Sequence, residues 1–299
     1  MNGILLVDKP AGMTSHTVVS KLRKKLNTKK IGHAGTLDPS ATGLLAVCVG
    51  QATKISSYVM DGDKTYQTKF EFGKVTTTYD TEGKITSTAD ASCISRNQIL
   101  ETLPRFTGDI LQTPPMYSAI KIQGKKLYQY ARANEEIEIE PRPVRIENLK
   151  LNSFDPPFAE LEIDCSKGTY VRSIVHDLGQ ALNVGASVIS IHRLRSSPFS
   201  LNQAVSLSVL LEMDIEKIQQ CMISIQDALK SKFEIIEVSD EQEVAIRQGK
   251  EMPKSITSKE MASDQLILFV SKSSGQETAI ARWETRGYFV PSCFLEQLL

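Results

Sequence analysis

Residues 32–43 constrain this chain more than any other stretch: they read GHAGTLDPSATG, and the apolar run LLAVCV follows directly. Three glycines in so short a loop let the backbone bend sharply or let another molecule come close. Asp38 and His33 are the side chains of the loop that are capable of acid, base or nucleophilic chemistry. Local structure alone favours a purely structural role for Asp38, because Asp-Pro commonly opens a turn and Asp before Pro is an ordinary helix start.

Composition excludes several kinds of protein. The 299 residues suffice for one large domain or two, and 41% hydrophobic with 23% charged residues is typical of a soluble globular protein. No apolar stretch nears the ~18 residues of a membrane-spanning helix, so we expect no membrane association. A strand predicted at 4–7 leaves no room for a leader peptide. Five widely spaced cysteines predict reduced core thiols in a cytoplasmic protein.

Motif spacing excludes several chemistries. The loop at 32–43 lacks the Gly-Lys-Ser/Thr ending of a phosphate-binding P-loop. The four histidines and five cysteines form neither a His-Glu-x-x-His nor a Cys-x-x-Cys pattern, so we expect no metal site. The Gly-x-Ser-x-Gly elbow of a serine hydrolase does not occur. What remains is a carboxylate with a cationic and an aromatic partner, and we expect no cofactor.

The neutral net charge conceals an uneven distribution. Residues 1–35 contain seven Lys or Arg and one acid, whereas residues 210–245 contain nine acids and three bases. A basic face attracts phosphates even when the total charge is zero, although charge runs are as often solvated surface. Residues 113–145 interleave tyrosines with lysines and arginines, a pattern that suits stacking on unpaired bases and neutralising phosphates. A surface loop with its tyrosines turned inward explains that segment equally well.

Periodicity predicts strands and helices that alternate without a strict βαβ rhythm. Residues 66–72 and 159–165 alternate as strands, and a helix with an apolar stripe follows the turn at 166–169. Arg172 lies off this stripe in the first helical turn, where the helix dipole disfavours a cation. Such a charge suggests a specific carboxylate partner, although exposed arginines often occupy such positions without one. We predict an α+β fold with a mixed or antiparallel sheet. A small all-β unit follows from about 231, with short strands at 233–238, 266–270, 279–283 and 287–290.

The loop at 32–45 is one of several stretches that match the sequence motifs of a single protein family. Two further stretches are as specific, Pro114–Lys121 and Lys167–Arg172, while Lys64–Tyr66, Asp8–Gly12 and Thr78–Gly83 match more loosely. Together they resemble the TruB family, the bacterial tRNA pseudouridine-55 synthases. The chain departs from the family pattern in three places: His16 stands where Asn is usual, Thr77 replaces an acid, and His192-Arg193 replaces two arginines.

The resemblance implies a specific architecture. It implies a pseudouridine-synthase sheet domain over residues 1–230, within which residues 113–145 are an insertion that closes over RNA. A small RNA-binding domain similar to the PUA fold then occupies residues 231–299, an assignment that depends mostly on its position. The implied partner is the T-stem-loop of tRNA, and we expect the protein to be a monomer in the cytoplasm.

The resemblance also implies roles for individual residues. Asp38 is the expected nucleophile, attacking either the anomeric carbon of the ribose or C6 of the base. Arg172 would pair with Asp38 and favour its ionised form, and Tyr66 would stack on the flipped base and help remove the C5 proton. His33 would hold the RNA loop. The residues expected to line or brace the pocket are Lys9, Asp80, Tyr170 and Ile191.

A second interpretation belongs to another class of protein. The basic amino-terminal region and the Tyr/Lys segment would serve an RNA-binding or RNA-folding module equally well, without any turnover. Asp38 distinguishes the two, because a pure binder has no need of a carboxylate that faces phosphates.

Overall fold

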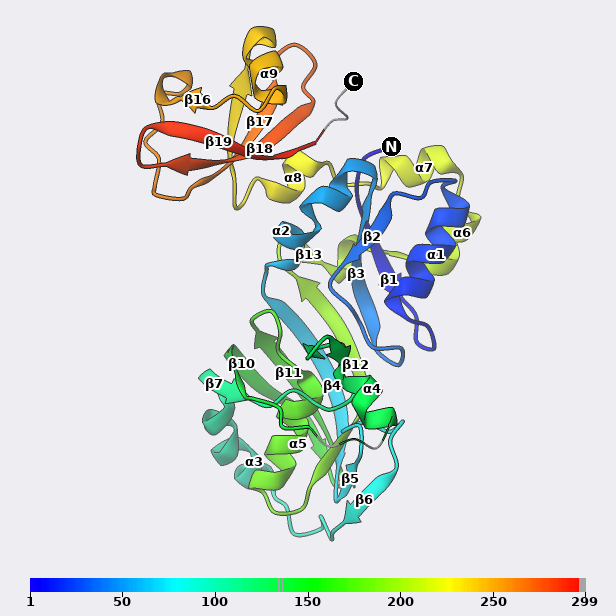
Figure 1. Ribbon diagram of the computed structural model, residues 1–299. Coiled ribbons are helices and arrows are strands. Elements are labelled where there is room, and N and C mark those ends of the chain that lie inside the picture. Colours follow the sequence, from blue (N-terminus) through cyan, green and yellow to red (C-terminus); the bar gives the residue numbers. More distant parts are fainter. Residues whose placement is uncertain (134, 136, 296–299) are drawn as a thin grey trace.

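The computed structural model describes residues 1–133, 135 and 137–295. Over these residues, most strands belong to two sheets: a large mixed sheet through the body, and a smaller sheet formed by the carboxy-terminal residues (Figure 1). The predicted α+β class is confirmed. Within the same residues, no helix combines the length and the apolar character needed to cross a membrane.

The large sheet contains ten strands among the described residues and is mixed, because parallel and antiparallel neighbours both occur. Along the sheet the order is β14 (Val205–Ser206), β1 (Gly3–Lys9), β3 (Thr42–Val49), β12 (Ala186–Ser196), β4 (Lys64–Phe72), β11 (Phe158–Cys165), β10 (Arg142–Asp155) and β7 (Gly108–Gln112). Two shorter strands extend it: β2 (Ile31–Ala34) pairs with β3, and β13 (Phe199–Ser200) pairs with β12.

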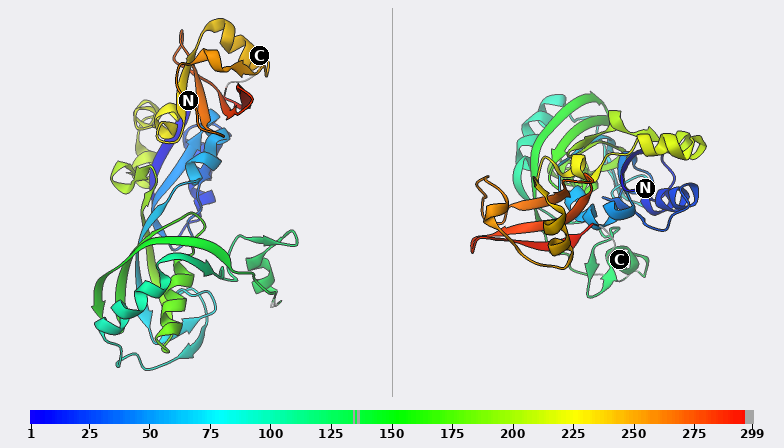
Figure 2. Two further views of the ribbon diagram at one scale, coloured as in Figure 1. Left: turned by 90° about the vertical axis from the view of Figure 1, so that its left-hand side faces the viewer. Right: turned by 90° about the horizontal axis from the view of Figure 1, so that it is seen from above.

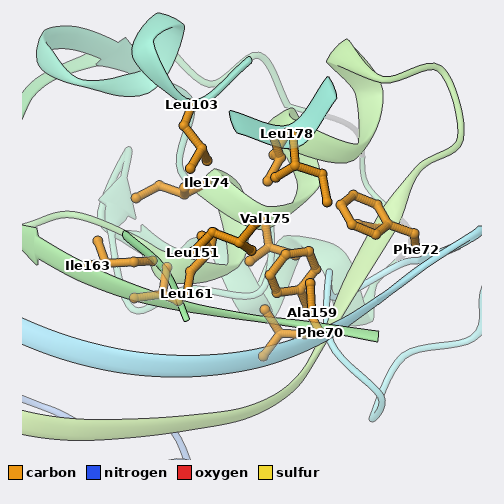
Figure 3. Packing of buried hydrophobic residues seen from close by; sticks show 14 of the residues in the cluster. Phe70, Phe72, Leu103, Leu151, Ala159, Leu161, Ile163, Ile174, Val175 and Leu178 are labelled. Carbon is orange, nitrogen blue, oxygen red and sulfur yellow. The ribbon is translucent and has the colours of Figure 1, made fainter. Parts of the chain in front are cut away.

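Helix α5 (Val171–Ala181) covers one face of this sheet. Its apolar stripe, with Ile174, Val175 and Leu178, packs on buried side chains of β4 and β11 such as Phe70 and Leu161 (Figure 3). Burial of several large apolar side chains, each contributing about 1.5–3 kcal/mol, fixes the helix against the sheet. The first turn of α5 is thereby held in place, and that turn carries Arg172.

A second core lies around β1, β2 and β3. Helix α1 (Ser15–Lys25) begins at Thr14, whose hydroxyl caps the Thr17 amide, and buries Val18, Val19 and Leu22 against these strands. The other helices on this half of the sheet and along the chain after it are α2 (Ser56–Met60), α6 (Leu207–Glu212), α7 (Ile215–Gln220) and α8 (Ile225–Leu229), with short 3₁₀ turns at Gly50–Ile55 and Leu201–Gln203.

The far half of the sheet carries smaller elements. These are the hairpin β5 (Lys74–Thr76) and β6 (Ile85–Thr88), helix α3 (Arg96–Thr102) and a 3₁₀ turn at Leu103–Phe106. A second hairpin, β8 (Lys121–Ile122) with β9 (Lys125–Lys126), and helix α4 (Leu127–Arg132) form an arm that projects from the body in the left view of Figure 2. This arm lies within the segment 113–145, over residues 121–132. The last residues of that segment, from Arg142 on, belong to strand β10 of the large sheet.

The carboxy-terminal sheet has the order β15 (Glu234–Val238), β17 (Leu266–Ser271), β18 (Glu277–Glu284), β19 (Tyr288–Phe294) and β16 (Met252–Pro253). The predicted strands are confirmed, but the prediction of an all-β unit is wrong. Helix α9 (Asp240–Arg247) follows β15 and begins with a capping box between Ser239 and Gln242, and a 3₁₀ turn occupies Lys254–Ile256. That box was a readable signal for a helix start.

The expectation about the cysteines is correct only in part. All five thiols are free, yet only Cys48 and Cys165 are buried in the core. Cys93 and Cys221 are exposed and Cys293 is partly exposed. Short apolar runs around a cysteine therefore overstated its burial in this chain.

Candidate active site

The loop that carries Asp38 joins β2 to β3 and is held by hydrogen bonds to the amino-terminal segment. The Ser15 hydroxyl donates to the Leu37 carbonyl (3.1 Å) and accepts from the Leu37 amide (2.9 Å). The Pro39 carbonyl accepts from the Gly12 amide at 3.0 Å. No helix follows Asp38, since the chain bends at Pro39 and enters β3 at Thr42. The helix-start interpretation of Asp-Pro is therefore wrong.

Lys9 braces the same loop from inside the protein. Its side chain is fully buried, and its Nζ donates to the carbonyls of Pro10 (2.9 Å), Met13 (2.8 Å) and Pro39 (3.2 Å). Burial lowers the pKa of Lys9 to about 8, opposed by the nearby Asp38 carboxylate. At neutral pH the ammonium form still predominates. Lys9 thus acts on the backbone beside Asp38 and does not face the cavity described below.

Asp38 and Arg172 form an ion pair, with 2.8 Å between Oδ2 and Nη2. The two side chains differ sharply in exposure: Asp38 is 42% exposed, whereas Arg172 is 5% exposed. A buried guanidinium is thus fixed by its surroundings, and it holds a carboxylate that solvent or a substrate can reach. The carboxylate partner expected for a cation in the first turn of α5 is present.

Arg172 also joins two other segments of the chain. Its Nη1 lies 3.4 Å from Asp80 Oδ2 and donates to the Thr78 carbonyl at 2.9 Å, while Nη2 donates to the Tyr117 carbonyl at 3.1 Å. Asp80 is itself held, because its Oδ1 accepts from the Thr78 hydroxyl (2.5 Å) and the Glu82 amide (3.0 Å). Two carboxylates and two carbonyls thus surround a single guanidinium, which compensates its burial.

Asp38 and Arg172 open into a cavity of about 340 Å³. Three more of the expected site residues, Tyr66, Tyr170 and Ile191, line it, whereas Lys9, His33 and Asp80 do not. Its wall is therefore partly apolar and partly aromatic, with one carboxylate and several cations. The other side chains and backbone segments that line it are Gly35, Thr36, Leu37, Ala41, Met60, Lys64, Ser118, Ala119, Lys167, Gly168, Thr169, Val171 and Arg193.

The two tyrosines of the cavity are held from different elements. Tyr66 comes from β4, and burial raises the pKa of its phenol, while Arg193 opposes that shift. Tyr170 precedes α5; its amide donates to Gln112 Oε1 (2.8 Å), and burial raises the pKa of its phenol as well. Both phenols are therefore neutral at physiological pH, and each presents an aromatic surface to the cavity.

His33 lies on β2, outside the cavity and half-buried. Burial lowers the pKa of its imidazole, and the charges of Arg193 and His16 lower it further. Its Nδ1 has no hydrogen-bond partner among the residues that the structure describes. His33 is consequently neutral at physiological pH, and its contact with RNA remains a prediction.

Sequence reasoning gave no site role to three cations that line the cavity: Lys64, Lys167 and Arg193. Lys167 belongs to the same motif as Arg172, which could have indicated it. Lys64 donates to the carbonyls of Met60 (2.6 Å) and Gly62, and burial lowers its pKa to about 8. Lys64 is the first residue of β4 and precedes Tyr66 by two positions. This closeness in sequence could have indicated that Lys64 lines the cavity too. Arg193 carries no comparable local signal, because only the pairing of β12 with β3 and β4 brings it beneath the loop.

In the part of the chain that the structure describes, no three His, Cys, Asp or Glu side chains gather where they could hold a metal ion. The reactive groups that the cavity offers are a reachable carboxylate, two phenols and several cations. A flat ring that enters would meet aromatic and aliphatic side chains, and Asp38 would lie beside it. Such an arrangement suits nucleophilic chemistry on a planar heterocycle.

Comparison with known proteins gives consistent matches. The model for the TruB family pseudouridylate synthase N-terminal domain matches residues 23–171, and that for the tRNA pseudouridylate synthase B C-terminal domain matches residues 172–230. The tRNA pseudouridine synthase B of Pseudomonas aeruginosa (strain UCBPP-PA14) is 49% identical over 216 residues, 72% of this chain and 71% of that protein. The same enzyme of Clostridium tetani (strain Massachusetts / E88) is 40% identical over 270 residues, 90% of this chain and 92% of that one.

Two solved structures share the fold. A chain of an H/ACA RNP bound to a substrate RNA containing 2′-deoxyuridine has a TM-score of 0.75 at 19% identity, covering 99% of this chain and 85% of that one. A chain of a Cbf5-Nop10-Gar1 complex has a TM-score of 0.74 at 21% identity, covering 99% and 87%. Likeness at this level of identity concerns architecture alone, whereas the sequence matches above establish descent: the chain belongs to the TruB family of pseudouridylate synthases.

Proposed function

We propose that this protein converts the uridine at position 55, in the T-loop of tRNA, to pseudouridine, with Asp38 as the nucleophile. The observation that carries the proposal is the pairing of an accessible Asp38 with the buried Arg172 at the edge of an aromatic cavity. Family membership supports uridine isomerisation in tRNA, and the geometry supports the choice of carboxylate.

The reaction requires that the base leave its stack. A glycosidic bond inside a stacked loop is out of reach of a side chain in a cavity, so the nucleotide must be flipped out, at a cost of a few kcal/mol. Tyr66 and Ile191 lie on the cavity wall where they would contact the extruded ring. Stacking on an aromatic side chain contributes about 1–3 kcal/mol, which offsets part of that cost.

Asp38 would then add either to C1′ of the ribose, with departure of N1 of the base, or to C6 of the ring. In both routes the N1–C1′ bond breaks, the ring turns, and a C5–C1′ bond forms. The bond between Asp38 and the substrate then breaks, to C1′ as C5 attacks or to C6 by elimination, and the free carboxylate returns. A proton leaves C5 and N1 gains one, so that the product is an isomer of the substrate. Tyr66 is the proposed group that helps to remove the C5 proton. Arg172 keeps Asp38 oriented throughout, through its other bonds to Asp80, Thr78 and Tyr117.

The wider assignments are proposals of the same kind. Residues 1–230 would form the catalytic domain, and the arm within 113–145 would close over the RNA. Its Tyr128 ring already lies near the cations of Lys126 and Arg132, at 5.6 and 5.5 Å, as expected for a surface that binds bases and phosphates. Residues 231–299 would add RNA contacts. We also propose that the enzyme acts as a monomer in the cytoplasm.

The test uses an unmodified tRNA transcript labelled with tritium at C5 of uridine, because pseudouridine formation releases that hydrogen to water. Wild-type protein is expected to release one tritium per tRNA molecule. Asp38→Asn keeps the shape and removes the charge and nucleophile, so its rate is expected to fall at least about 1,000-fold while tRNA binding persists.

The matched control is Asp214→Asn, an exposed residue that precedes α7 outside the cavity, which is expected to keep the wild-type rate. Position is checked by mapping pseudouridine along the product. The proposal fails if Asp38→Asn retains the wild-type rate. It also fails if the wild type refolds tRNA without releasing tritium, the result expected of an RNA-folding module.

A further inference from the structure

Arg193 on β12 is a fully buried arginine, only 1% exposed. Among the residues that the structure describes, no Asp or Glu lies within ion-pair distance of its guanidinium, in contrast to Arg172 and Arg195, which have carboxylate partners. Burying a guanidinium is costly unless its donors are used. The N–H groups of Arg193 donate hydrogen bonds to the backbone at both ends of the loop that carries Asp38.

Three backbone carbonyls accept hydrogen bonds from Arg193. Its Nε donates to Leu44 at 2.7 Å, its Nη2 to Gly35 at 3.2 Å and its Nη1 to Thr36 at 3.4 Å. Gly35 and Thr36 lie before Asp38 in the loop and Leu44 lies after it, so one guanidinium ties both ends of the loop together.

The loop has glycines where it approaches Arg193. A Cβ at Gly43 would come within 2.4 Å of the Arg193 carbonyl oxygen, and Gly43 has φ +96°. A Cβ at Gly35 would lie 3.5 Å from Arg193 Nη1, at φ +103°. The close approach at Gly43 therefore excludes a side chain, and both backbone conformations disfavour one.

Arg193 also reaches the aromatic side of the cavity. It pairs with Tyr66 across the antiparallel β4–β12 ladder, both residues line the cavity, and the charge of Arg193 opposes the rise in the pKa of Tyr66. The same side chain thus bonds the loop of the proposed nucleophile and lies beside the tyrosine proposed to act on C5. Both groups must hold their positions relative to one ring.

Resting on the proposed function, we infer that Arg193 is a positioning residue: it fixes the Asp38 loop against β12 and thereby relative to Tyr66, its neighbour on β4. A planar fork of five N–H donors can serve the three carbonyls at once, whereas a lysine ammonium offers three donors from a single point. Arg193→Lys therefore keeps the charge and loses part of the geometry. A misplacement of about 1 Å between reacting groups lowers a rate by about 100-fold.

The experiment compares Arg193→Lys with Arg195→Lys, a matched change two residues away on the same strand. Arg195 is partly exposed and bonds Thr65 and Asp164 outside the cavity. For each variant three quantities are measured: the single-turnover rate of tritium release from the tRNA transcript, the Kd for that tRNA, and the folded fraction by circular dichroism. Arg193→Lys is expected to lose about 100-fold in rate with a Kd within about 2-fold of wild type, and Arg195→Lys to lose neither.

Each other outcome overturns the inference. Equal rates for the two variants would mean that Arg193 does not position the reacting groups. A Kd that rises as much as the rate falls would make Arg193 an RNA contact. If Arg193→Lys does not fold, Arg193→Gln is measured in its place, and failure of both to fold would make the residue a requirement of the fold alone. Absence of tritium release by wild-type protein would instead reject the proposed function.

Discussion

Arg172 connects parts of the chain that are far apart in sequence. It bonds Asp38, the Thr78–Asp80 turn and the Tyr117 carbonyl, and it is itself almost completely buried. Since its position is fixed by three segments, a change in any one of them is transmitted to Asp38. Asp80 is the partner that can be changed with the smallest loss of shape.

Asp80→Asn is expected to lower the single-turnover rate about 10-fold or more while leaving the Kd for tRNA nearly unchanged. The amide keeps hydrogen-bonding capacity toward Thr78 and Glu82 but removes one of the two negative charges that hold Arg172. Glu82→Gln, two residues away and exposed, is the control and should behave as wild type. An equal rate for Asp80→Asn and wild type would contradict this role.

Lys9→Met is expected to destabilise the fold by about 2 kcal/mol and to slow the reaction. The three carbonyls that accept from Lys9 would lose a buried donor, and each unsatisfied polar group costs about 1–3 kcal/mol, partly offset by removal of a buried charge. Urea unfolding measures the loss of stability. The same substitution at the exposed Lys84 should change stability by less than about 0.5 kcal/mol.

Reasoning from the sequence singled out the residues that a motif or an unfavourable local charge marked. Arg172 was visible as a cation at the wrong end of a helix dipole, and Asp38 as a lone carboxylate between glycines. Arg193 was noted only within the His192-Arg193 departure from the family pattern, and its role could not be predicted, because an arginine in a strand looks the same whether it faces solvent or a buried loop. Its role depends on which strands become neighbours, and that is a long-range property.

Among the elements, α5 was predictable and α9 was not predicted. The apolar stripe of α5 spans 11 residues, and its packing against β4 and β11 follows from that stripe. Helix α9 has eight residues, and only Ile246 is fully buried, so its stripe is too short to read. Its capping box was the usable signal, and the prediction of an all-β unit overlooked it.

Helix α5 also carries an unusual carboxylate. Burial raises the pKa of Asp177 to about 6, from an ordinary value of 3.8. Between pH 3.8 and about 6 the folded state therefore binds more protons than the unfolded state, and stability falls as pH rises through this range. Above about pH 6 the full penalty is present, and below about pH 3.8 it is absent.

Asp177→Asn removes this ionisation and is expected to stabilise the protein at pH 7 by about 1 kcal/mol, after allowance for partial exposure. At pH 3.5 the variant and the wild type should be equally stable. Urea unfolding at several pH values measures the difference. A stability gain that is independent of pH would show that the cause is packing and not the carboxylate charge.

On the scale of the whole molecule, the carboxy-terminal sheet shares a core with the amino-terminal half. Leu268, Val270 and Ile280 pack in one cluster with Ile4, Ala46 and other side chains of β1, β3 and α2. Strand β17 is apolar on both faces, which indicates that both faces are covered. The sequence indicates that another apolar surface covers this strand. It does not identify the residues, about 200 positions earlier in the chain, that form this surface.

Leu268→Ala is expected to cost about 3 kcal/mol, because Leu268 is fully buried in this shared cluster. Unfolding should be followed by fluorescence of the single tryptophan, Trp283 in β18, and by circular dichroism, and the two transitions should coincide. Val244→Ala, on the exposed side of α9, should cost little. An earlier transition for Trp283 alone would mean that the two parts unfold independently.

The triple attachment of Arg172 has a consequence for biosynthesis. Translation proceeds from the amino end, so Asp38, Asp80 and Tyr117 leave the ribosome before the guanidinium that unites them. A nascent polypeptide therefore lacks the ion pair that orients the Asp38 carboxylate until α5 has been made and has docked. Catalytic competence is acquired late, when more than half of the protein has already emerged.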